Sequence, residues 1–342
     1  MSDISFQFII VGLGSIGKRH AAFLDKRNSE LICIDPNPET KKWVSQNISS
    51  PNETFASLSL AKEKILSSSL KKIGIISNWG TLHFQSAKEL AKLRVKNLYI
   101  EKPIVNSFAA LEELKKMSSS VKIIGGFQVR YMGIDSKIKS IASQELGGPP
   151  SMISIAGGAC GVITNGIHFL DLAISIFDEN PISVSSNLSS SKINPRSNEL
   201  GFWEGSVTWN FNGKRTFSIN FSNLSSVRST AEIFCPNGKI KLNEDLSIDI
   251  FKRDQQEILN DSRVTRVGTP IKTNSQSHQP ESDQAFERVF SQLFDEKNIS
   301  IERELIATNA MLMALTASEL EKKLYFDELL ASKYIKKEWS IS

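Results

Sequence analysis

Residues 6–20 read FQFIIVGLGSIGKRH, and much of the expected fold follows from them. The first six residues form an apolar run suited to a buried strand, and three glycines follow with the spacing G-x-G-x-x-G before a helix-like segment. In such a turn Gly12 allows the tight bend, Gly14 lets the backbone approach a pyrophosphate, and Gly17 lets the helix pack close to the strand. The N–H groups and the positive dipole end of the helix then face the anion. The stretch predicts a βα unit that binds a nucleotide phosphate.

An acidic residue follows this unit at the distance typical of a dinucleotide-binding fold. The second expected strand, 31–34, ends at Asp35, 18 residues after Gly17, where a carboxylate accepts hydrogen bonds from an adenosine ribose. We therefore expect NAD as the cofactor, because a carboxylate repels the 2′-phosphate of NADP. Lys41 and Lys42 lie close enough in the sequence to keep NADP as the alternative. Glycines also gather in ordinary turns, so an α/β domain without a dinucleotide is the other interpretation.

The composition argues against several classes of protein. The chain has 342 residues, 40% hydrophobic and 23% charged, which suits two domains with sizeable cores. Its formal charge of +4 comes from dispersed lysines, so nucleic acid is not an expected partner. No apolar stretch reaches the length of a membrane span and no signal segment precedes the first strand, which predicts a cytoplasmic protein. The three cysteines form no ligand cluster, so no metal is expected.

The pattern of strands and helices divides the chain in two. Strand-like runs at 72–77, 97–100 and 121–124 alternate with helical spacing, which predicts a doubly wound parallel sheet, a Rossmann domain over residues 1–125. From 182 to 251 the apolar residues instead recur with a period of two. We expect a second α/β domain over 126–342, for substrate binding and oligomerisation, with a large, mostly antiparallel open sheet.

Three further expectations concern this second domain and its connections. The 205–242 sheet carries more aromatic area than a solvent-facing sheet should, which predicts a homodimer or homotetramer formed through it. The residues responsible are Trp203, Trp209, Phe211, Phe217 and Phe221. Residues 252–282 are polar and predict a long loop. The serine clusters near 67, 118 and 189 are interpreted as connectors.

Glu101-Lys102-Pro103 closes the fifth expected strand, at the sheet edge where a substrate would meet a nicotinamide. Proline restricts Lys102 to an extended backbone, and a cis bond before proline costs little. A partly desolvated lysine can donate or accept a proton, which makes Lys102 a candidate for proton transfer. The alternative is an exposed lysine at the end of a strand.

A second candidate segment, 161–172, reads GVITNGIHFLDL. If a helix begins near Thr164, then Thr164, His168 and Asp171 share one face. His168 is then a candidate catalytic residue, with a structural core histidine as the alternative. Arg130 begins the second domain and could clamp an anionic or polyol substrate, or else form a structural ion pair.

These motifs together resemble the Gfo/Idh/MocA oxidoreductase family. The resemblance covers about 5 to 325 and depends on order and spacing: G-x-G-x-x-G followed by His20, then His83, Glu101-Lys102-Pro103, Gly126-Phe127 with Arg130, Leu146-Gly147, and Gly161 through His168 to Asp171. It implies a Rossmann domain followed by an α/β domain with an open sheet. It also implies bound NAD(H) or NADP(H), and substrates that are sugars, nucleotide sugars or cyclitols.

The same resemblance implies roles for individual residues. Lys102, commonly followed by a cis proline, would transfer a proton with His168 as its partner. The expected cofactor-binding residues are Gly12, Gly14, Ser15, Ile16, Gly17, Asp35, Ser77, Asn78, His83, Glu101 and Lys102. The expected substrate-binding residues are Lys102, Arg130, Thr164, Asn165 and His168.

We therefore expect an NAD-dependent oxidoreductase that moves hydride between a nicotinamide and a hydroxyl or carbonyl of a sugar-like small molecule. The alternative is a non-catalytic sensor or regulator that binds a dinucleotide or a sugar on the same fold. Thr164 favours this alternative, because many family members carry an aspartate there. Asn78-Trp79 also replaces the Thr-Pro that commonly follows the fourth strand, which should alter the nicotinamide side of the pocket.

Overall fold

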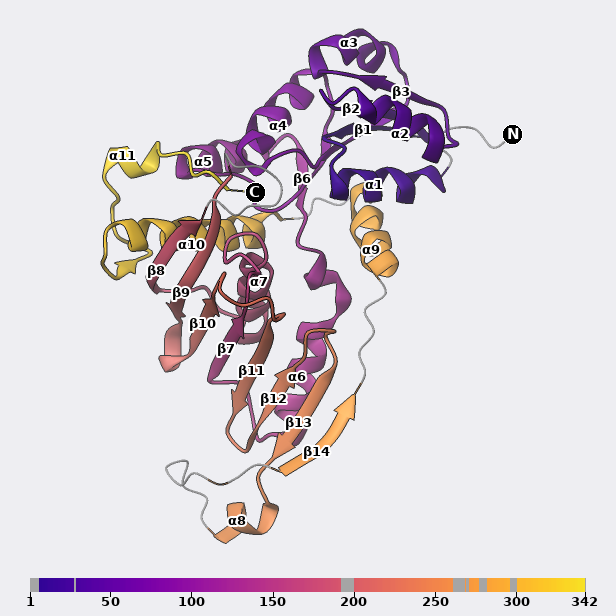
Figure 1. The fold of residues 1–342 in the computed structure, drawn as a ribbon. Helices are drawn as coiled ribbons and strands as arrows, with labels where there is room; N and C mark the ends of the chain where they lie inside the picture. Colours follow the sequence, from indigo (N-terminus) through magenta and orange to yellow (C-terminus); the bar gives the residue numbers. More distant parts are fainter. Residues whose placement is uncertain are drawn as a thin grey trace. The chain divides into compact units, whose positions relative to one another are not determined.

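The computed structural model of the chain describes residues 6–27, 29–191, 200–260, 268, 271–276, 282–295 and 300–341. These residues form two compact units, each with its own sheet (Figure 1). The first unit runs to Phe127 and also takes in Glu287–Thr308 and the residues from Ile335 on. The second unit comprises Gln128–Phe286 and Asn309–Tyr334.

The first unit is built on a six-stranded parallel sheet with the order β3-β2-β1-β4-β5-β6, which confirms the expected Rossmann fold. Its strands are β1 (Phe6–Val11), β2 (Ser29–Ile34), β3 (Asn52–Phe55), β4 (Lys71–Ile76), β5 (Asn97–Ile100) and β6 (Lys122–Gly125). Its helices are α1 (Ser15–Asp25), α2 (Glu39–Asn47), α3 (Leu58–Ser67), α4 (His83–Lys92) and α5 (Phe108–Met117). The strand order reverses between β1 and β4, and ligands of such sheets bind outside the carboxyl ends of the strands at that point.

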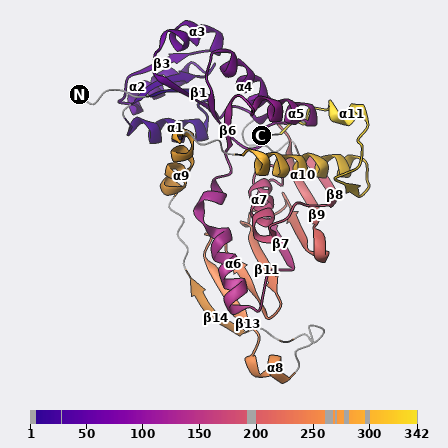
Figure 2. The same cartoon turned by 180° about the vertical axis from the view of Figure 1, so that it is seen from behind.

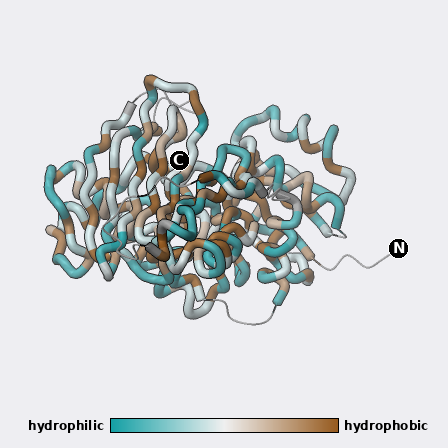
Figure 3. Tube along the Cα trace, turned by 90° about the horizontal axis from the view of Figure 1, so that it is seen from below, coloured by the Kyte–Doolittle hydropathy of each residue, from teal (hydrophilic) through white to brown (hydrophobic). Residues whose placement is uncertain are grey.

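The central strands of this sheet are apolar because both of their faces are covered. Ile9 and Ile10 of β1, Ile32 of β2 and Ile75 of β4 are fully buried. Figure 3 shows hydrophobic segments inside the fold and hydrophilic ones in the outer turns. The parallel sheet could be predicted because burial on both faces produces continuous apolar runs.

The first unit includes chain segments that the expected boundary of 126 had assigned to the second domain. Helix α9 (Ser282–Phe294) brings Phe290 onto Phe23, with ring centroids 5.3 Å apart, and Phe294 onto Phe6 at 4.7 Å. Near the end of the chain, the backbone N–H of Trp339 donates to the carbonyl of Asn106 at 2.9 Å. The physical reason for the different division is aromatic burial against the parallel sheet.

The described residues of the second unit form a nine-stranded sheet with the order β14-β13-β12-β11-β7-β10-β9-β8-β15, in which β7 and β10 pair in parallel and the other neighbours antiparallel. Its strands are β7 (Met152–Gly157), β8 (Ser183–Ser191), β9 (Phe202–Asn210), β10 (Thr216–Phe221), β11 (Thr230–Cys235), β12 (Gly238–Leu242), β13 (Ile248–Lys252), β14 (Ile271–Gln276) and β15 (Leu324–Tyr325). Its other elements are α6 (Ile134–Glu145), α7 (Gly166–Phe177), α8 (Gln255–Asn260), part of α10 (Glu302–Glu319) and α11 (Ser332–Ile335). This arrangement confirms the expected mostly antiparallel sheet, and Figure 2 shows α6 and α7 beside it.

The aromatic side chains that predicted an oligomer interface are largely covered inside the second unit. Trp209 is fully buried, stacks on Phe217 at 5.4 Å, and donates its indole N–H to the carbonyl of Ala310 on α10 at 3.1 Å. Phe211 packs edge-on against Phe177 of α7 at 4.9 Å. The helices of the same unit thus cover this apolar face, which explains the aromatic content without a second subunit. The homodimer or homotetramer itself stays a prediction.

Of two expectations about irregular segments, the loop at 252–282 was wrong and the serine connectors were wrong in part. Residues 252–282 contain α8 and the edge strand β14, whose backbone bonds come from β13 even though its side chains are polar. The remaining residues of that segment, 261–267, 269–270 and 277–281, lie outside the described residues. The serines near 189 belong to β8, which pairs with β9, and the Leu188 N–H of this strand donates to the Ser318 hydroxyl at 2.7 Å.

Candidate functional site

The glycine turn packs closely against the end of β4. Gly12 has φ +89°, and a Cβ added there would lie 2.5 Å from the backbone of Asn78. A Cβ on Gly17 would lie 1.9 Å from the Gly12 carbonyl oxygen. The Ser77 hydroxyl donates to that same carbonyl at 2.8 Å. These contacts explain why glycine is required at the first and third positions, and they make Ser77 a support of the turn.

The second glycine of the turn faces open space. Apart from Gly14 and its two chain neighbours, no residue in the described part of the chain has an atom within 4 Å of a Cβ built on Gly14, which is the N-cap of α1. The helix begins at Ser15, so the N–H groups of Ser15, Ile16 and Gly17 have no carbonyl partner one turn earlier within the helix. Open space beside such N–H groups is what a pyrophosphate needs. The residues of this turn therefore fit the expected dinucleotide.

Gly14→Ala is expected to weaken dinucleotide binding about ten- to hundredfold while the stability of the protein changes by less than about 1 kcal/mol, because the methyl group enters only the open space where we expect the pyrophosphate. Gly17→Ala should lose both binding and stability, since its Cβ meets backbone. Fluorescence titration with NADH and urea unfolding measure the two effects. Unchanged binding by Gly14→Ala would mean that the pyrophosphate lies elsewhere.

Asp35 is held against the glycine turn. Its Oδ2 accepts the backbone N–H of Leu13 at 2.6 Å, and its Oδ1 accepts that of Asn37 at 2.9 Å. The carboxylate is half-buried at the end of β2, on the same edge of the sheet as Gly14. Two backbone donors fix its direction, so Asp35 has both a structural role and the position expected for a ribose ligand.

The loop after β4 is tied to the loop after β5. His83 is 1% exposed, with Nδ1 2.8 Å from the Pro103 carbonyl and Nε2 3.1 Å from the Asn78 carbonyl. Burial lowers the pKa of His83. The hydrogen bonds to the two carbonyls raise this pKa, but burial has the larger effect. The imidazole is therefore neutral at neutral pH, and it donates to one carbonyl only. His83 links the two loops, and its expected contact with a cofactor stays a prediction.

The side chain of Asn78 lies beside the glycine turn. Its amide nitrogen donates to the Ser86 hydroxyl at 2.9 Å, and its amide oxygen is buried without a hydrogen-bond partner among the described residues. A buried amide oxygen without a partner is costly in a protein interior. Asn78 is thus placed at the expected cofactor edge with unused hydrogen-bonding capacity.

Lys102 follows β5 at the same edge of the sheet. The Lys102-Pro103 peptide bond is cis, as the resemblance implied, and the lysine side chain is half-exposed. The backbone N–H of Glu101 donates to the Ile76 carbonyl at 2.9 Å, which ties the end of β5 to β4. Lys102 therefore follows a residue whose backbone is tied to the neighbouring strand.

Glu101 is a buried carboxylate whose partners were not anticipated from the sequence. Its Oε1 lies 3.0 Å from His20 Nε2 and accepts the Tyr99 hydroxyl at 2.9 Å. Burial raises the pKa of Glu101, but the bond from His20, the electrostatic effects of His20 and Lys102, and the bond from Tyr99 act against it and lower the pKa to about 2. The available signal was His20, which stands three residues after the last glycine of the turn.

Arg130 in the second unit forms the structural ion pair that was its alternative interpretation. Its Nη2 lies 2.6 Å from Asp171 Oδ1 and its Nε 3.2 Å from Oδ2, a two-point contact. The Asp171 side chain is 2% exposed and that of Arg130 is 15% exposed. Because the guanidinium already pairs with a buried carboxylate, the contact supports a structural role for Arg130. The role of Arg130 as a substrate clamp stays a prediction, and this contact does not support it.

The expected helix face at 164–171 was partly wrong, because α7 begins two residues later than expected. Gly166 is its first residue and Asn165 its N-cap, so Thr164 lies before the helix and does not share a face with His168. The Asn165 amide donates to the Cys160 carbonyl, within a turn that contains Gly161 at φ +71°. The glycine-rich turn takes up the residues that helical spacing had assigned to the first turn. His168 itself is half-exposed on α7.

The expected residues thus fall into two groups. Gly12, Gly14, Ser15, Ile16, Gly17, Asp35, Ser77, Asn78, His83, Glu101 and Lys102 belong to the first unit, and Arg130, Thr164, Asn165 and His168 belong to the second. The first group lies in the loops at the carboxyl ends of β1, β2, β4 and β5 or in the helices that follow them. The pairing of Lys102 with His168 stays a prediction.

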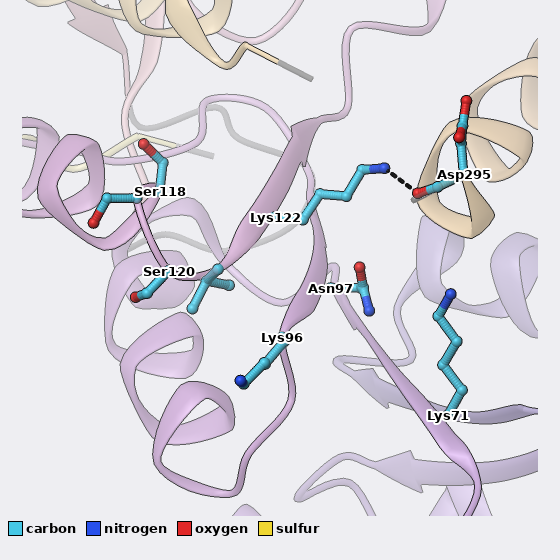
Figure 4. Close-up of a pocket in the computed structure, with 9 residues that line it drawn as sticks. Lys71, Lys96, Asn97, Ser118, Ser120, Lys122 and Asp295 are labelled. Carbon is cyan, nitrogen blue, oxygen red and sulfur yellow. Dashed lines mark hydrogen bonds between the residues drawn. The ribbon is translucent and has the colours of Figure 1, made fainter. Parts of the chain in front are cut away.

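A cavity of about 310 Å³ lies at the opposite end of the parallel sheet, at the amino ends of β4, β5 and β6 (Figure 4). Its lining includes Lys71, Lys96 and Lys122. The Lys122 ammonium donates to the carbonyl of Asp295 at 2.6 Å, and Lys71 approaches that of Phe294 at 3.4 Å, which are the last carbonyls at the end of α9. Lysines commonly cap helix C-termini in this way. The cavity is thus separate from the glycine turn.

The described residues contain no group of three or more histidine, cysteine, aspartate or glutamate side chains that could hold a metal ion. In the same part of the chain, no helix has both the length and the apolar character needed to span a membrane.

Comparison with protein families agrees with this geometry. Residues 6–126 match the model of the oxidoreductase family described by its NAD-binding Rossmann fold. This is the model of the Gfo/Idh/MocA oxidoreductase family, and the match spans the N-terminal Rossmann part of the chain. The model describes an NAD-binding Rossmann fold, in agreement with the dinucleotide-binding βα unit that the glycine turn predicted. Comparison with curated proteins gives no match.

Solved structures share the fold over nearly the whole chain. Myo-inositol 2-dehydrogenase from Lactobacillus plantarum has 15% identity and a TM-score of 0.67, over 94% of this chain and 99% of that one. Scyllo-inositol dehydrogenase from Lactobacillus casei, with bound NAD(H) and scyllo-inositol, has 16% identity and a TM-score of 0.66 over 94% and 99%. Aldose-aldose oxidoreductase from Caulobacter crescentus, complexed with glycerol, has 15% identity and a TM-score of 0.69 over 94% and 100%. At identities this low, the similarity in structure establishes the shared fold alone.

Proposed function

We propose that this protein is an NAD-dependent oxidoreductase that transfers hydride between a nicotinamide and a hydroxyl or carbonyl of a sugar, nucleotide sugar or cyclitol. The observation that carries the proposal is the position of Lys102, at the same carboxyl edge of the sheet as the glycine turn. The names of the inositol dehydrogenases and of the aldose-aldose oxidoreductase support the sugar-like substrate class.

The bound nicotinamide supplies the hydride chemistry, and the residues of the chain handle the proton. In the oxidative direction Lys102, with His168 as its partner, takes the proton of the substrate hydroxyl while the carbon gives up hydride. In the reductive direction the same groups return the proton to the carbonyl oxygen. Glu101 remains ionised beside Lys102 and takes no part as an acid.

NAD(H) is expected to bind at least about tenfold more tightly than NADP(H), because the Asp35 carboxylate accepts bonds from a ribose diol and repels a 2′-phosphate. Asp35→Asn removes the charge and keeps an oxygen that can accept the N–H of Leu13. This variant should reduce the preference for NAD(H) over NADP(H), because it weakens the binding of NAD(H) and strengthens the binding of NADP(H). Titrations of both cofactors measure the ratio, and equal affinities in the unmodified protein would remove Asp35 from this role.

The substrate class is tested by purifying the protein, identifying any co-purified dinucleotide, and following absorbance of the reduced nicotinamide with a panel of cyclitols, aldoses and nucleotide sugars. Turnover that depends on NAD with a member of this panel supports the proposal. Dinucleotide-dependent turnover restricted to compounds without a sugar or cyclitol ring would overturn the substrate class.

A second candidate function is a sensor that binds dinucleotide or sugar without turnover. Thr164 favours it, because threonine cannot serve as a carboxylate base where many family members have aspartate. The two candidates differ in the consequences of Lys102→Ala. An enzyme loses turnover, whereas a sensor has no turnover to lose and keeps its dinucleotide binding.

A further inference from the structure

Three polar side chains meet in the interior of the first unit, next to Lys102 in the chain. We call them the Glu101 cluster: His20 from α1, Tyr99 from β5, and Glu101. His20 and Tyr99 are fully buried, and Glu101 is 7% exposed. Both partners reach the same carboxylate oxygen, His20 Nε2 at 3.0 Å and the Tyr99 hydroxyl at 2.9 Å.

The direction of these hydrogen bonds follows from the charge of the carboxylate. Glu101 is ionised over the whole neutral range, because the hydrogen bonds from His20 and Tyr99 and the electrostatic effects of His20 and Lys102 outweigh its burial and hold its pKa at about 2. An ionised carboxylate only accepts, so both partners donate, and the proton of the contact is on His20 Nε2. Glu101 thus receives two buried donors on one oxygen, which restricts its rotation.

The packing around the cluster leaves little room for movement. The His20 ring meets Tyr99 edge-on at 4.9 Å, and Phe290 of α9 stacks on Tyr99 at 5.9 Å. A Cβ added to Gly126 would lie 2.8 Å from both Glu101 Oε2 and the Tyr99 hydroxyl. The carboxylate is therefore fixed by donors on one oxygen and by close backbone on the other.

The cluster joins two parts of the candidate site. His20 lies one helical turn after Gly17 on α1, the helix whose N-terminus fits a pyrophosphate. Glu101 immediately precedes Lys102. A hydrogen bond between residues 81 positions apart in the sequence thus connects the phosphate-binding helix to the lysine of the proposed proton transfer.

We propose that His20 is a positioning residue that acts through Glu101: by donating to the carboxylate, it keeps a negative charge fixed beside Lys102 and so stabilises the ammonium form of that lysine. The proposal rests on the proposed function for the role of Lys102. The titratable groups around Glu101 are His20 from α1, Tyr99 from β5, His83 from α4 and Lys102 itself. A test must therefore read Lys102 directly.

The reactivity of the Lys102 amine gives such a reading in the free protein. The protein is trace-labelled with acetic anhydride at pH 8, and acetylation of Lys102 is measured by mass spectrometry, with the exposed Lys88 as the internal standard. Glu101→Gln should speed the labelling of Lys102 about three- to tenfold, the increase in free amine that accompanies a fall of half a unit to one unit in its pKa. His20→Leu should act in the same direction by at least about twofold, because the carboxylate loses the donor that holds it.

Three further variants make the result specific. His20→Gln places an amide N–H near the position of Nε2 and should return labelling close to that of the unmodified protein. The double variant His20→Leu/Glu101→Gln should label Lys102 at the same rate as Glu101→Gln alone, because His20 acts through Glu101. Gln7→Leu is the matched control: it removes a buried donor to Glu30, at 2.8 Å, at the amino end of the same sheet, and should leave Lys102 unchanged.

Circular dichroism melting establishes that each variant is folded. If His20→Leu does not fold, Tyr99→Phe removes the other donor with a smaller change and should also speed labelling. Unchanged labelling in the folded His20→Leu and Tyr99→Phe variants, or an equal change in Gln7→Leu, would overturn the proposal. Failure of the proposed function would give a different result: no substrate would be turned over, while the variants would still show the expected changes in Lys102 labelling.

Discussion

Lys102→Ala is expected to reduce turnover by about 10²- to 10⁴-fold, the usual contribution of a positioned proton-transfer group. The affinity for NAD(H) should change little, because we expect the glycine turn and Asp35 to make the contacts with the pyrophosphate and the ribose. The loss should fall on kcat and on kcat/KM alike, since the interaction is made in the transition state. Steady-state kinetics on an identified substrate and a dinucleotide titration measure the two quantities.

The control for this prediction is Lys88→Ala, which removes an exposed lysine of α4 paired at 3.5 Å with Glu113. It should leave both quantities unchanged. His168→Ala is expected to resemble Lys102→Ala if the two residues act together. Normal turnover in Lys102→Ala would end the proposed mechanism, whereas loss of cofactor binding in this variant would mean that Lys102 is a binding residue.

Arg130→Met is expected to destabilise the second unit by about 3–5 kcal/mol, the cost of removing one partner of a buried ion pair. Asp171, at 1% exposure, would lose the two-point contact that now compensates its burial. Urea unfolding monitored by tryptophan fluorescence measures the loss, and Trp209 lies in the core of the same unit.

The comparison variant is Arg215→Met, which removes an ion pair with Glu179 in the same unit. Those side chains are 24% and 22% exposed, so water compensates part of the loss and the effect should be clearly smaller. An Arg130→Met protein with normal stability but a raised KM would contradict the structural role and restore Arg130 as a substrate clamp.

The parallel sheet and the glycine turn could be predicted because their signals are local. A strand buried on both faces produces an apolar run such as 72–77, and a turn against backbone requires glycine at positions such as Gly12. Asp35 was found in the same way, by its distance from the turn. Alternation with a period of two likewise predicted the antiparallel sheet of the second unit.

Predictions from local periodicity were wrong where an element is held by a neighbouring strand or turn and its own side chains show no clear pattern. Strand β14 is polar and exists because β13 offers it backbone hydrogen bonds. The serine-rich β8 is held by β9 in the same way. The start of α7 moved because the turn at Gly161 takes up residues that helical spacing alone assigned to the helix.

From the order of its residues alone this chain could be assigned a glycine turn before a helix, an acid after the second strand, a lysine at the sheet edge and two kinds of sheet, since each depends on neighbours within a few tens of residues. The distant hydrogen-bond partners of the buried polar side chains could not be assigned from the order of the residues. His20 meets Glu101 across 81 positions, Arg130 meets Asp171 across 41, and Trp209 meets the Ala310 carbonyl across 101. Such contacts depend on how strands and helices stack, and only the folded chain brings their two ends together.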